Sequence, residues 1–410
     1  MNGTGLWHAE QAWLGHRAEG VLIEVEKGRI KSVTEGAVAP AGAVPLKGWT
    51  IPGLANVHSH AFQRLLRGET ESGGGDFWDW RKQMYRYSDW DPADYFNHAR
   101  RVFREMLEAG ITAVGEFHYL HAHGNELGEA LIDAAREEGI RITLIDACYL
   151  RGGLDGRPLD HEQQHFSDGN VERWVQRVDE LKDADGVRIA AAIHSVRAVD
   201  PASMRVVAAW ARKRRSPLHI HLAEQPSEVQ ECWAVEGCSP AELLKREGIL
   251  GPDLTAVHAI HVDQDDVALL GRHQVSICAC PTTERDLGDR VGPLRALADA
   301  GCPLTVGSDS NAVIDIIEEA RALELDQRRA TGRRVIHAPE DLLRAATADG
   351  MRALGWEAGE IKPGMLADFV TVDEPESTLW RELTPAYLVF GFAGCDVTNV
   401  VVGGNTVLHK

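Results

Sequence analysis

The sequence lacks a long apolar run, and this absence removes one class of protein at the outset. None of its hydrophobic stretches approaches the ~18 consecutive apolar residues that a membrane-spanning helix requires. Its first residues, MNGTGLWHAEQAW, contain neither the basic segment nor the apolar segment of a secretory signal peptide. We therefore expect a cytoplasmic protein without a membrane partner.

Positive charge and paired cysteines are also scarce. The chain has 43 lysine and arginine residues against 62 aspartate and glutamate residues, a formal net charge of −19. Because phosphate binding needs a basic patch, we expect no nucleic-acid partner. The seven cysteines form no CxxC pair, and several lie in apolar stretches such as VSICAC. We interpret them as buried, reduced thiols.

What the sequence does contain is a regular alternation of apolar, β-rich runs with helical segments. Hydrophobic residues make up 44% of the 410 residues, which is enough for a large core. Strand and helix alternating eight times predicts an α/β protein, the parallel (β/α)8 TIM barrel. The eight predicted strands are 54–58, 111–117, 141–147, 187–194, 217–222, 255–260, 274–279 and 303–308. Helices over 316–330 and 338–354 are expected to close the barrel.

The two ends of the chain have a different pattern from the middle. Residues 1–50 and 360–410 show strand alternation with glycine turns and little helix. Each half would expose an apolar face on its own, so we expect them to pair into a small β-sandwich domain. Residues 51–359 then form the metal-dependent catalytic barrel. Two insertions with glycine-rich pieces, 65–90 and 150–170, are expected to be loops over the catalytic face.

Histidines occur at several of the predicted strand ends. His58 and His60 end the first strand, His221 ends the fifth, the sixth carries His258, and Asp309 follows the eighth. Active sites of such barrels lie at the carboxyl ends of the strands. Residues two apart share one face of a strand, so both imidazoles of the first strand can reach one zinc ion. We therefore predict a catalytic zinc site of His58, His60, His221 and Asp309, with room for a water molecule.

Some neighbouring residues leave alternatives open. His219 shares a face with His221, and we prefer His221 as the ligand because it lies closer to the strand end. Glu224 lies at an odd offset from His221, so a catalytic role requires that the strand has already turned into its loop. We interpret His121 and His123 as loop residues. We expect one metal ion per chain. Iron suits the same ligands as zinc, so the sequence leaves both metals as alternatives.

Four motifs follow one another along the chain: HSHAFQR, HIHLAEQ, VHAIH and GSDS. With these motifs in this order, the chain resembles the amidohydrolase superfamily. The segments NVHSHAFQR, FWDWRKQMYR, EFHYLHA, IHSVRAV and HLAEQ resemble more closely the N-formimino-L-glutamate deiminases of histidine degradation. The likeness covers nearly the whole chain. It implies a zinc-dependent hydrolysis of N-formimino-L-glutamate, a small anionic substrate derived from an amino acid, to N-formyl-L-glutamate and ammonia. It also implies a homodimer.

The resemblance further implies roles for individual residues. Glu224, His258 and Asp309 would be the catalytic residues, with Glu224 and His258 acting on the attacking water. Glu224 would take a proton from this water and pass it to the leaving nitrogen, and His258 would stabilise the tetrahedral intermediate. Five residues would hold the substrate: Gln63, Arg81, Tyr119, His194 and Arg197.

Two arginines suit a substrate with two carboxylates. Arg81 and Arg197 offer bidentate donors to an anion within a protein that is acidic overall. The alternatives are that Arg81 is a surface side chain and that Arg197 pairs with Asp200. For Tyr119 and His194, the alternative is that they are ordinary packed residues at strand ends.

Asn311 departs from the family pattern, since we expect a histidine after GSDS, and this leaves the exact substrate open. One alternative is a related amidohydrolase that deaminates another formimino-amino acid or a nucleobase-type heterocycle. Another is a two-zinc amidase, which needs a bridging carboxylated lysine at the fourth strand end, where none of the nine lysines lies. A barrel that has lost catalysis is disfavoured because every predicted ligand and Glu224 are present.

Overall fold

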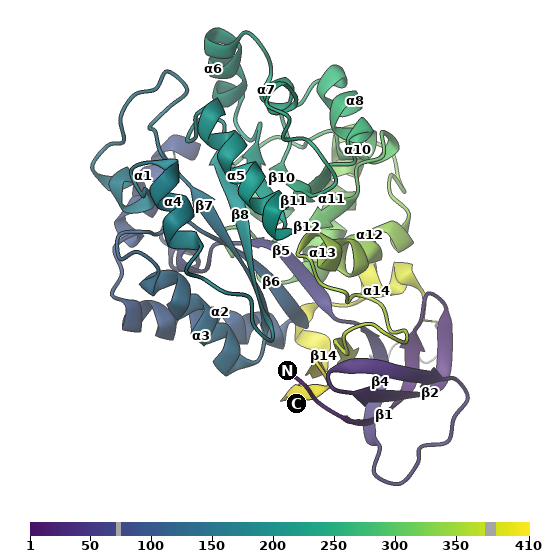
Figure 1. The fold of residues 1–410 in the computed structure, drawn as a ribbon. Coiled ribbons are helices and arrows are strands. Elements are labelled where there is room, and N and C mark those ends of the chain that lie inside the picture. The colour runs from purple at the N-terminus through teal and green to yellow at the C-terminus, as the bar shows by residue number, and fades with distance from the viewer. Residues whose placement is uncertain (71–74, 374–382) are drawn as a thin grey trace.

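The computed structural model describes residues 1–70, 75–373 and 383–410 (Figure 1). Eight parallel strands form one sheet in the order β12-β11-β10-β9-β8-β7-β6-β5, so neighbours in the sheet are neighbours in the chain. Each overlaps one of the predicted strands, and the predicted (β/α)8 barrel is confirmed. The strands are β5 (Leu54–Ser59), β6 (Ile111–His118), β7 (Arg141–Cys148), β8 (Val187–Ser195), β9 (Leu218–Leu222), β10 (Leu254–His258), β11 (Ser276–Ala279) and β12 (Leu304–Val306).

Helices cover the outside of the barrel (Figure 1). Every residue of β6 and β7 is buried, because the barrel interior covers one face and helices cover the other. The helices are α2 (Pro92–Glu108), α3 (Glu126–Glu138), α4 (Val171–Val178), α5 (Pro201–Arg214), α6 (Pro226–Glu236), α7 (Pro240–Arg246), α8 (Gln264–Arg272), α9 (Pro281–Asp286), α10 (Leu294–Asp299), α11 (Ile316–Thr331), α12 (Pro339–Ala346), α13 (Ala348–Ala353) and α14 (Pro385–Gly391). Within 1–70, 75–373 and 383–410, no helix is long and apolar enough to cross a membrane.

The first and last strands join at the rim where the predicted metal ligands lie. An isolated parallel bridge pairs Ser59 with Asp309. The amide of Asp309 donates to the His58 carbonyl oxygen at 2.9 Å, and the amide of His60 donates to the Asp309 carbonyl oxygen at 2.8 Å. A Cβ atom at Gly307 would lie 2.7 Å from the His58 carbonyl oxygen, so glycine permits this close approach. Residues far apart in the sequence are therefore fixed together where the strands end.

The predicted helix over 338–354 is two helices in the structure. Thr347 separates α12 from α13, with φ −127° and ψ −97°. Its hydroxyl donates to the carbonyl oxygen of Leu343 at 2.7 Å, and a Cβ atom at Gly359 would lie 2.6 Å from Cα of Ala348. The backbone at the start of α13 thus packs directly against the backbone at Gly359. The helical pattern of the sequence could not predict this tertiary contact.

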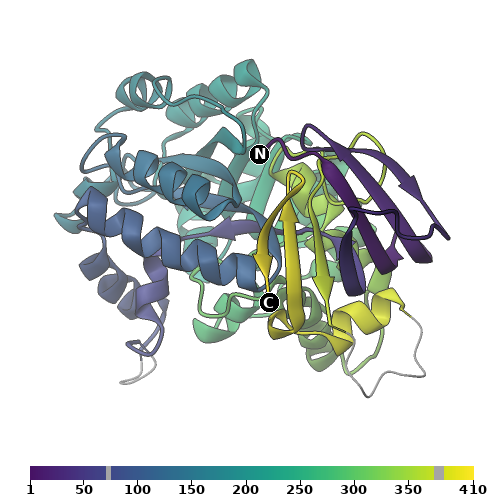
Figure 2. The ribbon, with the colours of Figure 1, turned by 90° about the horizontal axis from the view of Figure 1, so that it is seen from below.

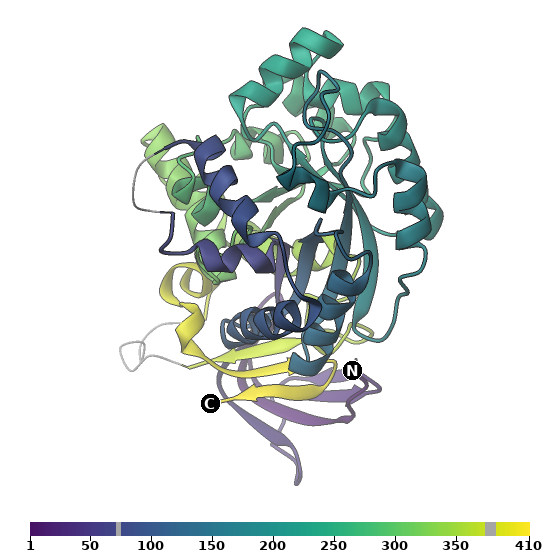
Figure 3. The ribbon, with the colours of Figure 1, turned by 90° about the vertical axis from the view of Figure 1, so that its left-hand side faces the viewer.

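The two ends of the chain pair into a seven-stranded mixed sheet in the order β15-β14-β13-β4-β1-β2-β3, which lies below the barrel in Figure 3. Figure 2 shows its N-terminal strands in purple beside its C-terminal strands in yellow. It has its own core, in which the rings of Trp7 and Phe369 lie 5.8 Å apart. The strands are β1 (Gly5–Trp13), β2 (Arg17–Glu26), β3 (Arg29–Thr34), β4 (Val44–Pro52), β13 (Phe369–Val372), β14 (Val397–Val402) and β15 (Asn405–His409).

The expected sandwich is therefore built as one continuous sheet, joined where β4 pairs antiparallel with β13. The division into one domain of residues 1–50 plus 360–410 and another of residues 51–359 stays a prediction. The seven cysteines form no disulfide, and six of them are buried. Cys395 is exposed in the short helix η5 (Gly394–Asp396), so the prediction of burial is wrong for this residue.

The two insertions contain helices as well as loops. Residues 65–90 include the end of η1 (Ala61–Leu66), α1 (Phe77–Met84) and η2 (Tyr85–Tyr87), and residues 150–170 include η3 (Glu162–Phe166). Asp76 caps α1 by accepting from two backbone amides. Most of the glycine-rich piece before it, residues 71–74, lies outside the described residues.

Candidate metal centre and active site

Three histidines and one aspartate converge at the carboxyl end of the barrel. One ligand atom from each of His58, His60, His221 and Asp309 lies within 4.8 Å of the other three, and we call these residues the metal group. His58 lies in β5, His60 directly after it, His221 in β9 and Asp309 after β12. All of these side chains are buried. The structure thus brings together the residues that the sequence analysis selected from three strand ends.

Hydrogen bonds to backbone carbonyl groups orient two of the imidazoles. Nδ1 of His60 lies 2.9 Å from the carbonyl oxygen of Phe117, and Nδ1 of His221 lies 3.0 Å from that of His194. A carbonyl oxygen only accepts, so each Nδ1 carries the ring proton and each Nε2 presents a lone pair. Nε2 of His221 lies 3.1 Å from Nε2 of His58. The lone pair of His221 Nε2 therefore faces the Nε2 atom of His58.

This arrangement of donor atoms fits a divalent cation. Nε2 of His58 and Nε2 of His60 each lie 3.4 Å from Oδ1 of Asp309. Lone pairs at such separations repel one another unless a positive charge lies among them. Burial lowers the pKa of His58, His60 and His221, that of His60 to about 3, so protons on these rings do not supply this charge at neutral pH. Zinc and iron suit such nitrogen and oxygen ligands.

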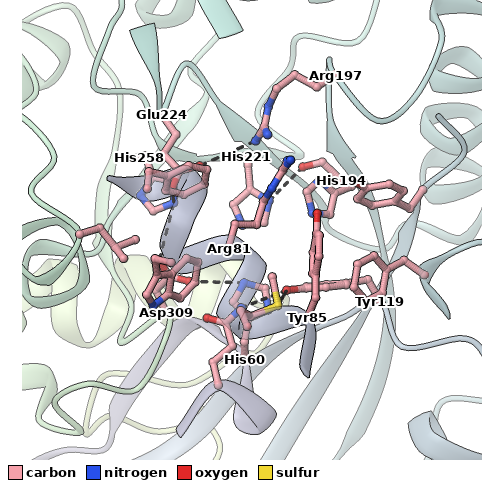
Figure 4. Close-up of a pocket in the computed structure, with 17 residues that line it drawn as sticks. His60, Arg81, Tyr85, Tyr119, His194, Arg197, His221, Glu224, His258 and Asp309 are labelled. Atoms are coloured by element: carbon pink, nitrogen blue, oxygen red, sulfur yellow. Dashed lines mark hydrogen bonds and ion pairs between the residues drawn. The ribbon is translucent and has the colours of Figure 1, made fainter. Parts of the chain in front are cut away.

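Glu224 and His258 lie beside the metal group (Figure 4). Ala223 has φ +50°, so the chain has turned before Glu224, which lines the same pocket as Asp309 despite its odd offset from His221. Nε2 of His258 lies 3.7 Å from Oε1 of Glu224 and 3.7 Å from Oδ2 of Asp309. Burial raises the pKa of Glu224 to about 7. A carboxylate with this pKa can accept and release a proton near neutral pH.

His258 differs in charge from the neutral imidazoles of the metal group. Burial acts to lower its pKa, but the charge of Glu224 and a 3.2 Å contact between Nδ1 and Oε1 of Glu284 outweigh this and raise the pKa to about 10. Its ring is therefore a cation that donates hydrogen bonds. His219, the alternative ligand, lies deeper, where its Nε2 contacts the carbonyl oxygen of Ala353 at 3.4 Å.

A pocket opens in front of the metal group (Figure 4). Its lining includes Glu224, His258 and Asp309 on one side. All the residues predicted to hold the substrate line the same pocket: Gln63, Arg81, Tyr119, His194 and Arg197. The predicted catalytic and substrate residues therefore share one cavity.

The two arginines of the pocket have different partners. Nε of Arg197 donates to Glu228 at 2.6 Å, and its Nη2 lies 3.8 Å from Glu224. It does not pair with Asp200, whose carboxylate caps α5 instead. The guanidinium of Arg81 lies 4.5 Å from the ring centroid of Trp78, and its Nε is buried without a hydrogen-bond partner in the described part of the chain. Arg81 therefore has hydrogen-bonding capacity left for a ligand.

Gln63, Tyr119 and His194 line the pocket next to the metal group. Nε2 of Gln63 donates to the hydroxyl of Tyr119 at 3.0 Å. The ring of Tyr119 contacts His60 and His194 edge-on, with centroids 5.2 Å and 5.3 Å apart. Burial lowers the pKa of His194 well below its ordinary value, so this ring is a neutral hydrogen-bonding group.

Several residues that line the pocket were not predicted from the sequence, among them Tyr85, Tyr149 and Phe166. Tyr149 directly follows β7, so the rule that strand ends supply the site would have found it. Tyr85 lies within the FWDWRKQMYR segment that carried the resemblance. Phe166 ends η3 in the second insertion, and no sequence pattern marks it.

Asn311, the departure from the family pattern, supports the metal group from behind. Its Nδ2 donates to Oγ of Ser59 at 3.1 Å and to the carbonyl oxygen of His60 at 3.0 Å. Its Oδ1 accepts from Oγ of Ser308 at 2.6 Å. The side chain is fully buried and is not among the described residues that line the pocket. Asn311 therefore joins β5 to the segment after β12.

A second buried group consists of His118, His121 and Asp146. His121 follows β6 outside regular structure, as predicted, but its side chain is fully buried. Arg177 donates to both carboxylate oxygens of Asp146, at 2.7 Å and 2.8 Å, and Nε1 of Trp174 donates at 2.8 Å. A guanidinium thus already neutralises the carboxylate of the second group.

A model of the amidohydrolase family matches residues 49–407 of the chain. The chain is 35% identical to the formimidoylglutamate deiminase of Pseudomonas aeruginosa, over 96% of this chain and 90% of that protein. It is 29% identical to a 5-methylthioadenosine/S-adenosylhomocysteine deaminase of Natronomonas pharaonis, over 96% of this chain and 89% of that protein.

Solved structures agree with the fold. An amidohydrolase from Brucella melitensis superposes with a TM-score of 0.92 at 31% identity, over 99% of this chain and 95% of that one. A zinc-containing adenosine deaminase from Xanthomonas campestris superposes with a TM-score of 0.86 over 100% of this chain and 93% of that one, and at 24% identity it supports the fold alone. The chain therefore belongs to the amidohydrolase family and is a hydrolase that acts on C–N bonds.

Proposed function

We propose that the protein hydrolyses N-formimino-L-glutamate to N-formyl-L-glutamate and ammonia. One observation carries the proposal: a single pocket has a histidine and aspartate group on one side and two arginines, Arg81 and Arg197, among its other lining residues. An amidine carbon needs an activated water molecule, and two carboxylates need fixed cations. The name of the P. aeruginosa relative, formimidoylglutamate deiminase, agrees with this proposal.

His58, His60, His221 and Asp309 would hold one zinc ion per chain, because their lone pairs already converge. When bound, such an ion supplies the Lewis acidity that makes water a nucleophile at neutral pH. The remaining chemistry belongs to side chains of this chain.

Glu224 would move the proton. Water adds to the amidine carbon, and Glu224 accepts the proton that this water loses. The carboxylic acid delivers this proton to the imine nitrogen. Glu224 then takes the hydroxyl proton of the tetrahedral intermediate and passes it to the same nitrogen, which leaves as ammonia when the C–N bond breaks and the formyl C=O bond forms. The pKa of about 7, raised by burial, suits both steps. The charged ring of His258, 3.7 Å from Glu224, would donate to the oxygen of the tetrahedral intermediate.

Arg81 and Arg197 would bind the carboxylates of the substrate. The chain has a net charge of −19, so an anion needs local cations to overcome the repulsion. Glu228 is fully buried and holds Nε of Arg197, which leaves the Nη atoms of the guanidinium for a ligand. Because Arg81 has a buried, unpartnered Nε, a carboxylate there would satisfy a donor that the described part of the chain leaves open.

Deamination of a nucleoside-like compound is the second candidate, and one observation favours it. The pocket has several aromatic side chains, among them Trp80, Tyr149 and Phe166, on which a base could stack. A neutral nucleoside has no anionic group for the two arginines to bind, so we place this candidate second. A two-zinc amidase is not supported, because β8 ends in Ile193, His194 and Ser195 without a lysine.

An ammonia-release assay tests the proposal. N-formimino-L-glutamate, N-formimino-L-aspartate, 5′-methylthioadenosine and guanine would be supplied in turn to the zinc-loaded protein. We expect a kcat/KM for N-formimino-L-glutamate that is at least about 100-fold above the others, since two charged contacts distinguish it. Turnover of a nucleoside or base with none of N-formimino-L-glutamate would overturn the proposal.

The resemblance also leads us to propose a cytoplasmic homodimer. Light scattering after size exclusion measures the mass of the assembly, and about twice the 45.0 kDa of one chain is expected.

A further inference from the structure

Tyr85 and Tyr149 line the same pocket as Arg81 and Arg197, and the proposed function gives them no role. Tyr85 begins η2 in the first insertion, and Tyr149 directly follows β7. Figure 4 shows Tyr85 among the pocket residues together with Arg81 and Arg197. The Arg81 guanidinium lies 5.6 Å from the Tyr85 ring centroid, so the phenol belongs to the arginine side of the pocket.

Gln163, from the second insertion, connects the two hydroxyl groups. Its Nε2 lies 3.3 Å from the hydroxyl oxygen of Tyr85 and 3.0 Å from that of Tyr149. The amide of Asp160 donates to Oε1 of Gln163 at 3.1 Å. Because a backbone N–H can only donate, this contact fixes which end of the side chain is oxygen. Both tyrosine oxygens therefore accept from the Gln163 amide.

The direction of these bonds leaves the two phenol protons available. A hydroxyl oxygen that accepts from an amide keeps its own O–H for another acceptor. Burial raises the pKa of Tyr85 and of Tyr149, so both stay protonated at neutral pH. In the described part of the chain two carboxylates line the pocket: Asp309 belongs to the metal group and Glu224 lies beside it. Within the described residues, the O–H groups of Tyr85 and Tyr149 therefore have no carboxylate acceptor in the pocket.

We propose that Tyr85 and Tyr149 donate hydrogen bonds to a carboxylate of the substrate and that Gln163 is the positioning residue that orients them as donors. The inference rests on the proposed function for the identity of the substrate. It requires only that the ligand presents a carboxylate to this side of the pocket. The two insertions over the barrel then act together, because Gln163 from one orients Tyr85 from the other.

The test replaces each tyrosine by phenylalanine, as Tyr85→Phe and Tyr149→Phe. Tyr87→Phe is the matched control, since Tyr87 ends the same short helix but is not among the described residues that line the pocket. We expect the KM for N-formimino-L-glutamate to rise about tenfold or more in each pocket variant, with kcat changed less than about threefold, because a hydrogen bond to a charged group is lost. The control should equal the wild type.

Two analogues then show whether a carboxylate is the acceptor. N-formimino-4-aminobutanoate lacks the α-carboxylate, and N-formimino-2-aminobutanoate lacks the side-chain carboxylate. The KM penalty of the tyrosine variants should vanish for the analogue that lacks the contacted carboxylate. The same penalty for all three compounds, or no penalty for any, would overturn the inference.

Calorimetric binding of N-formyl-L-glutamate separates this inference from the proposed function. If the wild type hydrolyses no formimino compound but binds N-formyl-L-glutamate about tenfold more tightly than the variants, the proposed function fails and the inference stands. If the wild type hydrolyses N-formimino-L-glutamate and all variants bind N-formyl-L-glutamate equally, the inference fails alone.

The role of Gln163 has its own readout. Gln163→Leu should raise KM about fivefold in the wild-type background and cause no further rise when both tyrosines are phenylalanine, because residues that act through one another are not additive. An equal rise in both backgrounds would show that Gln163 acts apart from the tyrosines.

Discussion

The metal group and the second group, both buried and both described by the structure, differ in what neutralises the carboxylate. In the second group, Arg177 donates to both oxygens of Asp146. In the metal group, Oδ1 of Asp309 faces imidazole nitrogens, while the charged His258 lies on the other oxygen, Oδ2. The carboxylate of the second group is thus neutralised by protein atoms alone. The metal group leaves converging lone pairs that a cation would satisfy.

Replacing the aspartate of each group should distinguish the two groups most clearly. Asp309→Asn removes a charged ligand, and we expect turnover to fall by about 10⁴-fold or more because activation of the water is lost. Asp146→Asn, the matched change in the second group, should leave kcat/KM within about threefold, because Asp146 lies outside the pocket lining in the described residues. Ammonia release from N-formimino-L-glutamate measures both. Equal losses in the two variants would contradict the distinction.

Glu224→Gln sharpens the comparison by separating metal binding from proton transfer. The amide keeps the shape of the side chain but cannot accept a proton, so we expect kcat to fall roughly 10³-fold. Zinc content should stay at about one per chain, because Glu224 is not in the metal group. Unchanged turnover would remove Glu224 from the mechanism, and loss of zinc would make it a ligand.

The arginine near each group can be compared in the same way, by the partners that its guanidinium has. Arg177 is held by Asp146 and Asp168, whereas Nε of Arg81 has no partner among the residues that the structure describes. We expect Arg81→Met to raise the KM for N-formimino-L-glutamate about 100-fold, because a charged contact to the substrate is lost. Arg177→Met should leave KM within about twofold and lower the midpoint of thermal unfolding instead. A steady-state titration of each variant measures KM, and an unchanged KM in Arg81→Met would contradict the proposed substrate contact.

The smallest expected effect is on stability in the second group. Asp146→Asn weakens a buried pair but leaves Arg177 with Asp168, so we expect about 2–3 kcal/mol of destabilisation. Urea unfolding measured by circular dichroism gives this number. A change below about 0.5 kcal/mol would show that Arg177 does not depend on Asp146.

Local patterns in the sequence predicted the strands and the metal group. β-rich apolar runs mark each barrel strand, and the alternation of side chains places His58 and His60 on one face. The barrel rule then gathers strand ends that are distant in sequence. Because these signals are local or follow from the fold class, they can be read without coordinates.

Contacts between distant segments were not predictable in this way. The bonds from Gln163 to Tyr85 and Tyr149 join the two insertions and the end of β7, and no periodicity encodes them. The buried state of His121 depends on packing beside Asp146 and Arg177. Such pairs form only when tertiary structure brings the segments together, so single-sequence reasoning left them out.

Metal analysis of two matched variants tests the distinction between the groups most directly. Protein dialysed against zinc and then against buffer would be analysed by inductively coupled plasma mass spectrometry for zinc and iron. The account predicts about one metal ion per chain in the wild type and in His118→Ala, and close to none in His60→Ala. Two ions in the wild type, or a full metal content in His60→Ala, would contradict it.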